Sequence, residues 1–333
     1  MKASFVEAAG PAESLRYGDL PTPDPAAGEV RVRVAAASVN PIDCYYRGGM
    51  VKVQLPTPYI PGCDLAGTVE AVGPGATRYK VGDRVWGSNQ GLNGRQGTLA
   101  EFACVGEDWL YPLPAGVSEK DAAAVALVGI TAHLGLFDRA NLKAGESVFV
   151  SGGTGGVGSV VVQMAKAAGA TVLTSAGSPE KAALAKSLGA DHVFHYKTEN
   201  VPAAVKAATG GKGVDVWFET VPPGDLDPTL DAVAPWGRVL LMAGRAAKPT
   251  FTNGTLYVKG ITLLGFAMFN FSAAAQRRCA DDINTWMASG RLRPLIGREF
   301  QLSEAAAAHK LQEENTLAKS GTLTGKIAVL PPG

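Results

Sequence analysis

The sequence lacks long apolar runs, blocks of basic residues and closely spaced cysteines. No apolar run approaches the ~18 residues of a membrane span, and no block of five Lys or Arg occurs in a chain with a formal net charge of +1. These absences argue against a membrane protein and against binding to nucleic acid. The four cysteines contain no C-x-x-C pair, which is typical of a reducing compartment. We therefore expect a soluble, cytoplasmic protein that binds a neutral small molecule.

Sequence motifs for metals and for activated nucleophiles are also missing. The chain has no H-E-x-x-H, no G-x-S-x-G and no P-loop, and its four histidines do not share a metal-like spacing. Cys44 and Cys63 could supply two ligands, but nothing nearby completes the three that a catalytic zinc needs. We therefore expect no metal, and an organic cofactor that carries the chemistry.

Glycine is abundant, at 41 of 333 residues, and the pattern between the glycines divides the chain. Up to about residue 123, short β segments such as EVRVRVAAASV and DLAGTVEAVG predict an antiparallel, barrel-like domain. Apolar strands then alternate with helices, which is typical of a doubly wound parallel sheet. The sequence predicts an α/β protein with a β-barrel domain (residues 1–123), a doubly wound domain (124–266) and a return to the first domain (267–333).

The segment SGGTGGVG, residues 151–158, contains the pattern G-x-G-x-x-G from Gly153 to Gly158. It lies between the apolar strand ESVFVSG and the helix-like run VGSVVVQMAKAAG. In that position the glycines allow a sharp turn, close approach of a pyrophosphate, and close packing of helix on strand. The segment therefore predicts a dinucleotide-binding turn.

The residues after the second strand of this domain indicate which dinucleotide binds. An acid about 20 residues after the glycines would accept hydrogen bonds from an unphosphorylated ribose. Here the run is Thr-Ser-Ala-Gly-Ser, with no acid before Glu180, and Lys181 follows. This arrangement favours NADPH, with Lys181 either contacting the 2′-phosphate or serving as an ordinary solvated helix residue.

Six segments of the chain carry a shared pattern: SVNPIDCYYRGG (38–49), PGCDLAGTVEAVG (61–73), VGDRV (81–85), GITA (129–132), SGGTGGVG (151–158) and GKIAVL (325–330). Together they resemble the zinc-free quinone oxidoreductases, the zeta-crystallin-like family of the medium-chain dehydrogenase/reductase superfamily. The resemblance covers essentially the whole chain. It implies a GroES-like catalytic domain and a Rossmann domain. The zinc-binding members of the superfamily have metal ligands where this chain has Asn40, Cys63 and a residue near Leu127, which implies an enzyme without zinc.

The resemblance also implies roles for individual residues. Asn40 and Tyr45 match the polar pair that faces nicotinamide and substrate, although each could instead be structural. A basic residue near the C-terminus, either Lys319 or Lys326, would complete the phosphate pocket. The residues matched to cofactor binding are Thr131, Gly153, Thr154, Gly155, Gly156, Val157, Gly177, Ser178, Lys181, Tyr196, Thr220, Ala243, Gly244, Arg245, Phe266, Met268 and Lys326.

The reaction implied is transfer of a hydride from NADPH to a small hydrophobic quinone in a cleft between the domains, with one- and two-electron reduction both open. A second reading is reduction of the activated double bond of an enone or alkenal, with Tyr45 or Tyr46 polarising the carbonyl. A third reading is a crystallin-like protein that binds NADPH or RNA with little turnover. By analogy, we expect a homodimer formed through the edge strands of the Rossmann domains.

Overall fold

The computed structural model describes residues 1–318 and 320–332 and divides into two compact units. Unit 1 comprises residues 1–128 together with the chain from residue 272 onward, and unit 2 comprises residues 129–271. Each boundary lies five residues after the predicted one. The first falls within the helix Glu119–His133 (α2), and the second falls just before the helix Ala273–Ala288 (α8). The chain therefore leaves unit 1 once and returns to it.

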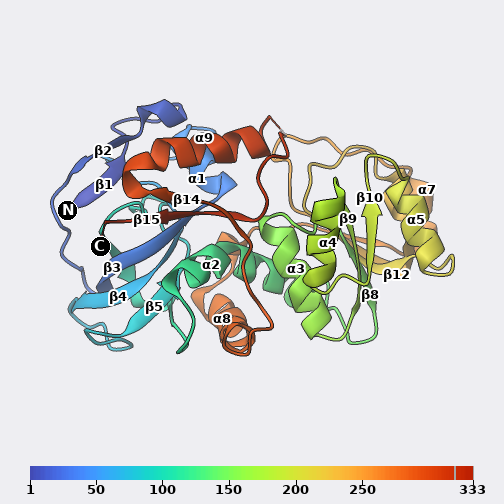
Figure 1. The fold of residues 1–333 in the computed structure, drawn as a ribbon, viewed down its shortest axis with the longest axis horizontal. Helices are drawn as coiled ribbons and strands as arrows, with labels where there is room; N and C mark the ends of the chain where they lie inside the picture. Colours follow the sequence, from blue (N-terminus) through green and yellow to red (C-terminus); the bar gives the residue numbers. More distant parts are fainter. Residues whose placement is uncertain (319, 333) are drawn as a thin grey trace. The chain divides into compact units, whose positions relative to one another are not determined.

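Unit 1 is built on a mainly antiparallel sheet with the strand order β14-β15-β3-β4-β5-β7 (Figure 1). The long strand β3 (Glu29–Val39) buries Val30, Val32 and Val34 while the residues between them face outward, which is the predicted period-two alternation. The other strands of this unit are β1 (Lys2–Phe5), β2 (Arg16–Asp19), β4 (Asp64–Val72), β5 (Arg84–Gly87), β6 (Phe102–Gly106), β7 (Leu110–Pro112), β14 (Ile296–Gln301) and β15 (Lys326–Leu330).

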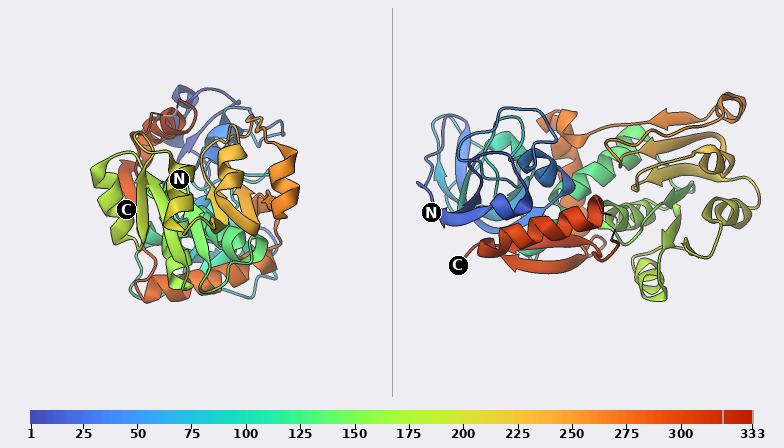
Figure 2. Two further views of the ribbon diagram at one scale, coloured as in Figure 1. Left: turned by 90° about the vertical axis from the view of Figure 1, so that its right-hand side faces the viewer. Right: turned by 90° about the horizontal axis from the view of Figure 1, so that it is seen from above.

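One edge of β3 is shared by two strands. β6 pairs with residues 29–33 of β3, and β15 pairs with residues 37–39, so the chain's last strand adds to its first long one. The helices of this unit are α1 (Pro41–Arg47), α8 (Ala273–Ala288) and α9 (Ala305–Thr316). Helix α9 runs beside the paired strands β14 and β15 in Figure 1 and in the right-hand view of Figure 2. α9 also packs on α1, so the returning segment supports the start of the domain.

Helix α2 continues as a π-helical segment to Arg139. The combined helix Glu119–Arg139 is long and apolar enough to cross a membrane by length and composition, and 78% of its most apolar window is buried inside the folded chain. An apolar helix buried on all sides is typical of a protein core.

Unit 2 is a doubly wound domain whose six strands run parallel in the order β10-β9-β8-β11-β12-β13. This confirms the predicted Rossmann architecture. Its strands are β8 (Ser147–Val150), β9 (Thr171–Ala176), β10 (His192–His195), β11 (Val214–Glu219), β12 (Val233–Leu241) and β13 (Thr262–Leu264). Its helices are α3 (Gly156–Ala167), α4 (Pro179–Ser187), α5 (Val201–Ala208), α6 (Asp227–Asp231) and α7 (Asn253–Lys259). The order reverses beside β8, and ligands of such sheets bind at the carboxyl ends of the strands at that point.

Candidate active site

The glycine-rich turn lies at the carboxyl end of β8, where the strand order of unit 2 reverses. Gly152 makes the turn with a φ of +66°, and Gly155 is the N-cap of α3 with no side-chain cap. A Cβ at Gly153 would overlap the side chain of Thr174, and one at Gly158 would overlap the carbonyl oxygen of Gly152. Only glycine fits these positions, so the turn keeps the first N–H groups of α3 clear of side chains, as a pyrophosphate requires.

A second group of predicted residues meets at the ends of β9 and β10. A Cβ at Gly177 would overlap the phenol of Tyr196, so the tyrosine lies directly against the backbone there. Ser178 is the N-cap of α4, and its hydroxyl accepts a hydrogen bond from the backbone N–H of Lys181 at 3.3 Å. Tyr196 is 54% exposed. The structure thus brings all four residues predicted for the 2′-phosphate to one exposed corner of the sheet.

The remaining predicted cofactor contacts of unit 2 follow the other strands of the same sheet. The hydroxyl of Thr220, just after β11, donates to the carbonyl oxygen of Ser151 at 2.5 Å and so borders the glycine turn. Gly244 lies in the turn after β12 with a φ of +76°, between Ala243 and Arg245. Phe266 and Met268 follow β13, and Thr131 is a buried residue of α2. Since the carboxyl ends of parallel strands lie along one edge of a sheet, the residues that follow β11, β12 and β13 share the rim that the turn occupies.

Glu219 is a residue of this rim that sequence reasoning missed. Its carboxylate accepts hydrogen bonds from the hydroxyl of Ser151, the indole N–H of Trp217 and the backbone N–H of Val221. It therefore ties the end of β11 to the end of β8, directly before the glycine turn. The available signal was an acid at the end of an otherwise apolar strand.

In unit 1, Tyr45 is a half-buried residue near the end of the short helix α1. Its carbonyl oxygen accepts from the backbone N–H of Met50 at 2.9 Å, which fixes the chain that follows the helix. The phenol of the next residue, Tyr46, donates to the side-chain oxygen of Asn93 at 3.1 Å. The loop 88–97 is thereby tied to α1.

Two residues predicted for the site, Asn40 and Lys326, are buried in unit 1. Asn40 is fully buried, with both ends of its side-chain amide bonded inside the protein, so that amide does not reach out to an acceptor. The ammonium of Lys326 is also buried and donates to Asn40 and to the carbonyl oxygen of Val39 at 2.9 Å, which leaves it unavailable to a phosphate. Its alternative, Lys319, lies outside the described residues. Both side chains belong to one buried polar cluster, which the sequence did not reveal.

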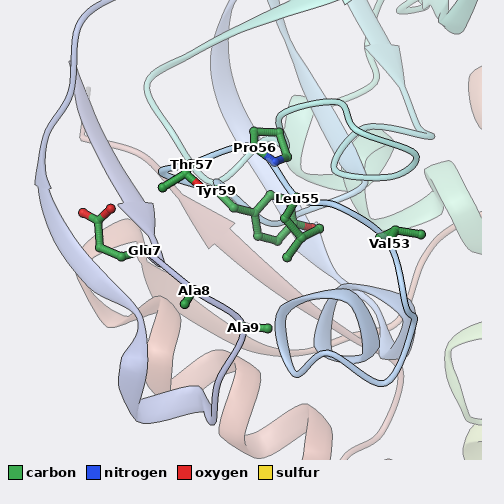
Figure 3. Close-up of a pocket in the computed structure, with 8 residues that line it drawn as sticks. All are labelled: Glu7, Ala8, Ala9, Val53, Leu55, Pro56, Thr57 and Tyr59. Carbon is green, nitrogen blue, oxygen red and sulfur yellow. The ribbon is translucent and has the colours of Figure 1, made fainter.

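Two hollows of unit 1 lie away from the predicted site residues. A cavity of about 260 Å³ in unit 1 is lined by residues of the loop 53–59 and of the segment 7–9 (Figure 3). A second hollow, of about 430 Å³, is lined by residues 7–11, Glu13, Ser14 and Arg16. None of the predicted site residues lines either one. Among residues 1–318 and 320–332, no three His, Cys, Asp or Glu side chains are grouped as metal ligands.

Comparison with known proteins agrees with this geometry. The family model described as an alcohol dehydrogenase GroES-like domain matches residues 26–115, and that of a zinc-binding dehydrogenase matches residues 156–283. The chain is 37% identical to a quinone oxidoreductase of Pseudomonas aeruginosa over 341 residues, covering 99% of both proteins. It is 34% identical to the quinone oxidoreductase of Rattus norvegicus over 324 residues, covering 97% of this chain and 95% of the rat protein.

Two further matches bear on cofactor and substrate. The Escherichia coli quinone oxidoreductase, solved in complex with NADPH, superposes with a TM-score of 0.85 at 25% identity and covers 99% of this chain and 100% of that one. A 2-haloacrylate reductase of a Burkholderia species is 29% identical over 326 residues, covering 92% and 94% of the two chains. With full-length relatives above 30% identity and the same fold, the chain belongs to the quinone oxidoreductase family of the medium-chain dehydrogenase/reductase superfamily.

Proposed function

We propose that this protein is an NADPH-dependent oxidoreductase that reduces quinones without zinc. The observation that carries the proposal is the corner formed by Gly177, Ser178, Lys181 and Tyr196, which has a lysine and hydroxyl groups where an NAD-binding site has an acid. The family supports the quinone as acceptor, since its members similar to this chain are named for it.

The residues present fit a bound dinucleotide. At Gly153, Gly158 and Gly177 a Cβ would overlap a neighbour, so the backbone at these strand ends stays open to a ligand. The turn 152–156 and the first N–H groups of α3 would hold the pyrophosphate, and Lys181 would pair with the 2′-phosphate. Thr220, held against Ser151, would line the ribose on the nicotinamide side. When bound, NADPH supplies the hydride at C4 of its nicotinamide.

Under the proposed function, Tyr45 is the residue that contacts the acceptor. A phenol donates a hydrogen bond to a carbonyl oxygen and can deliver a proton as charge develops there. Asn40 has no such part in the proposal. Its role is to hold the first turn of α1, from which Tyr45 projects.

A second candidate is reduction of an activated double bond, which the relative that acts on 2-haloacrylate favours. Steady-state oxidation of NADPH with 1,2-naphthoquinone and with an alkenal separates the two, with Tyr17→Phe, an exposed tyrosine of β2, as the control. We expect the wild type to turn over with the quinone. Tyr45→Phe should lower kcat about tenfold or more with the alkenal. Its effect on kcat with the quinone should be smaller, because quinone reduction needs little proton assistance. Oxidation with neither acceptor would leave a nucleotide-binding protein without turnover.

The proposal includes a homodimer joined through the edge strand β13. Trp236, Tyr257 and Val258 are 79%, 70% and 73% exposed, which is unusual for large apolar side chains. The Trp236 ring lies against Gly260, two residues before β13, so part of this apolar surface borders the unpaired edge of the sheet. A second copy would cover both.

A cytoplasmic location is supported by the free thiols of Cys44, Cys63, Cys104 and Cys279.

A further inference from the structure

Five polar side chains of unit 1 meet in a buried group around the start of α1, which we name the α1 cluster. Its members are Asn40, Asp43, Asp64, Ser88 and Lys326, and none is more than 5% exposed. They come from four separate parts of the unit: α1 and its N-cap, β4, the end of β5, and β15. The cluster contains two carboxyl groups and one ammonium.

The α1 cluster forms hydrogen bonds with both ends of the side-chain amide of Asn40 and with its backbone N–H. Its side-chain N–H donates to Asp64 at 2.8 Å, and its side-chain oxygen accepts from the ammonium of Lys326. Its backbone N–H donates to Asp43 at 2.8 Å, which completes a capping box at the first turn of α1. The amide therefore has one orientation, and that orientation depends on Lys326 and Asp64.

Asp64 extends the cluster to two more elements. Its Oδ1 atom accepts from the hydroxyl of Ser88 at 2.7 Å and from the backbone N–H of Leu127 in α2 at 3.1 Å. Its Oδ2 atom, which accepts from Asn40, lies 3.9 Å from the ammonium of Lys326. Burial raises the pKa of Asp64 and lowers that of Lys326, because removing either charge from water is costly.

Helix α1 needs such external support, because it has only seven residues and isolated helices of that length are not stable. The α1 cluster holds its first turn. Its last residue, Arg47, is fully buried and pairs with Glu313 of α9. Tyr45 lies between these two anchors, so the direction of its side chain follows from them.

We infer that Lys326 and Asp64 are positioning residues for acceptor reduction, acting through Asn40 and the first turn of α1 on Tyr45. This inference rests on the proposed function. Replacing a buried ion pair by well-packed apolar groups of similar volume often costs little stability, whereas the hydrogen bonds of this pair hold the Asn40 amide in one orientation. The network therefore acts on turnover of the acceptor more than on folding or on NADPH, whose contacts under the proposed function lie in unit 2.

The test compares Lys326→Met with the double variant Lys326→Met/Asp64→Asn, which removes the ammonium together with the carboxylate that lies 3.9 Å from it. Lys120→Met is the control, since Lys120 is an exposed lysine paired with Glu299 in the same unit. In the double variant we expect a thermal midpoint near that of the wild type, an NADPH Kd changed by less than about twofold, and kcat for 1,2-naphthoquinone lowered about tenfold or more. Hydrogen exchange of the amides of residues 43–48 should quicken in the double variant and not in the control.

Wild-type kcat and unchanged exchange in the double variant would overturn the inference. So would losses of NADPH affinity and kcat in equal proportion, because these would show a role in folding alone. Failure of the proposed function has a different signature, which is a wild-type protein that does not oxidise NADPH with the quinone. In that case the exchange of residues 43–48 still decides whether the cluster positions α1.

Discussion

Lys181 is the residue on which the preference for NADPH over NADH depends. Replacing it with Ala should weaken NADPH binding by about 1.5–3 kcal/mol, the size of a charge-assisted hydrogen bond, and leave NADH binding nearly unchanged. Titration calorimetry with both cofactors measures this difference. Lys186→Ala, in the last turn of the same helix, is the matched control. Equal losses for the two cofactors would show that Lys181 does not contact the 2′-phosphate.

Asp43 is the residue with the clearest expected effect of pH. Burial raises the pKa of its carboxyl from 3.8 to about 7, with the Cys63 thiol as a partner and Asp64 as a repelling neighbour. Between these values the folded protein keeps a proton that the unfolded chain releases, so the free energy of unfolding falls as pH rises. The stabilisation is complete below the unfolded pKa and is lost as pH rises through about 7.

Asp43→Asn removes this titration and should flatten its part of the pH dependence. His309 has the opposite effect, since burial lowers its pKa from 6.5 to about 3, and stability falls as pH drops through that range. In the wild type, the free energy of unfolding therefore depends on pH through two groups whose effects have opposite signs. Thermal midpoints of wild type and variant from about pH 5 to about pH 8 should differ increasingly in favour of the variant. A constant difference across the range would contradict the account.

At the residue scale, the sequence indicates local geometry where a motif constrains the backbone. Gly153, Gly158 and Gly177 are positions where a Cβ would overlap a neighbour, and such constraints appear as motifs. The sequence did not reveal the hydrogen bond between Asn40 and Lys326, because these residues are 286 positions apart. No local pattern records such a contact.

The glycine turn is the element whose geometry has the most direct consequence for binding. A Cβ at Gly158 would overlap the backbone of Gly152, so Gly158→Ala must displace the turn. NADPH and NADH should therefore both bind at least about tenfold more weakly, since both share the pyrophosphate. Fluorescence titration of either cofactor measures the change.

Gly254→Ala provides a matched control for that variant. Gly254 lies in α7 of the same unit, with no atom within 4 Å of an added Cβ. Its cofactor affinities should equal those of the wild type. Unaltered binding in Gly158→Ala would mean that the turn does not hold the pyrophosphate.

Element by element, the sequence predicted the long and strongly patterned segments, among them β3, α3 and the parallel strands of unit 2. It did not predict α1, α7 or α9. Helices of seven residues such as α1 and α7 hold less than two full periods of apolar spacing, and α9 begins with an alanine run that has no polar face to mark its orientation. These elements acquire their form from packing, as α9 does against α1.

For the whole molecule, the proposed dimer predicts the effect of removing the exposed indole. Trp236 adopts a φ of +62°, which Asn tolerates better than most residues, so Trp236→Asn removes apolar surface without backbone strain. We expect the wild type to elute with the mass of two chains and the variant to dissociate at low micromolar concentration. Light scattering after gel filtration measures both, with Tyr17→Asn of unit 1 as the control. A monomeric wild type would rule out the dimer.

At this scale the alternation of strands and helices was enough to predict two domains and the return of the chain to the first. The exposed group around Trp236 was not predictable, because sequence patterns do not tell an exposed tryptophan from a buried one. The reaction itself rests on the family and on the corner around Lys181.

The most direct test of the central claim is steady-state reduction of 1,2-naphthoquinone by the wild-type protein with NADPH and with NADH, each corrected for the reaction without protein. The account predicts quinone-dependent oxidation of NADPH, with a kcat/KM about tenfold or more above that for NADH. No quinone-dependent oxidation of NADPH, or a preference for NADH, would contradict it.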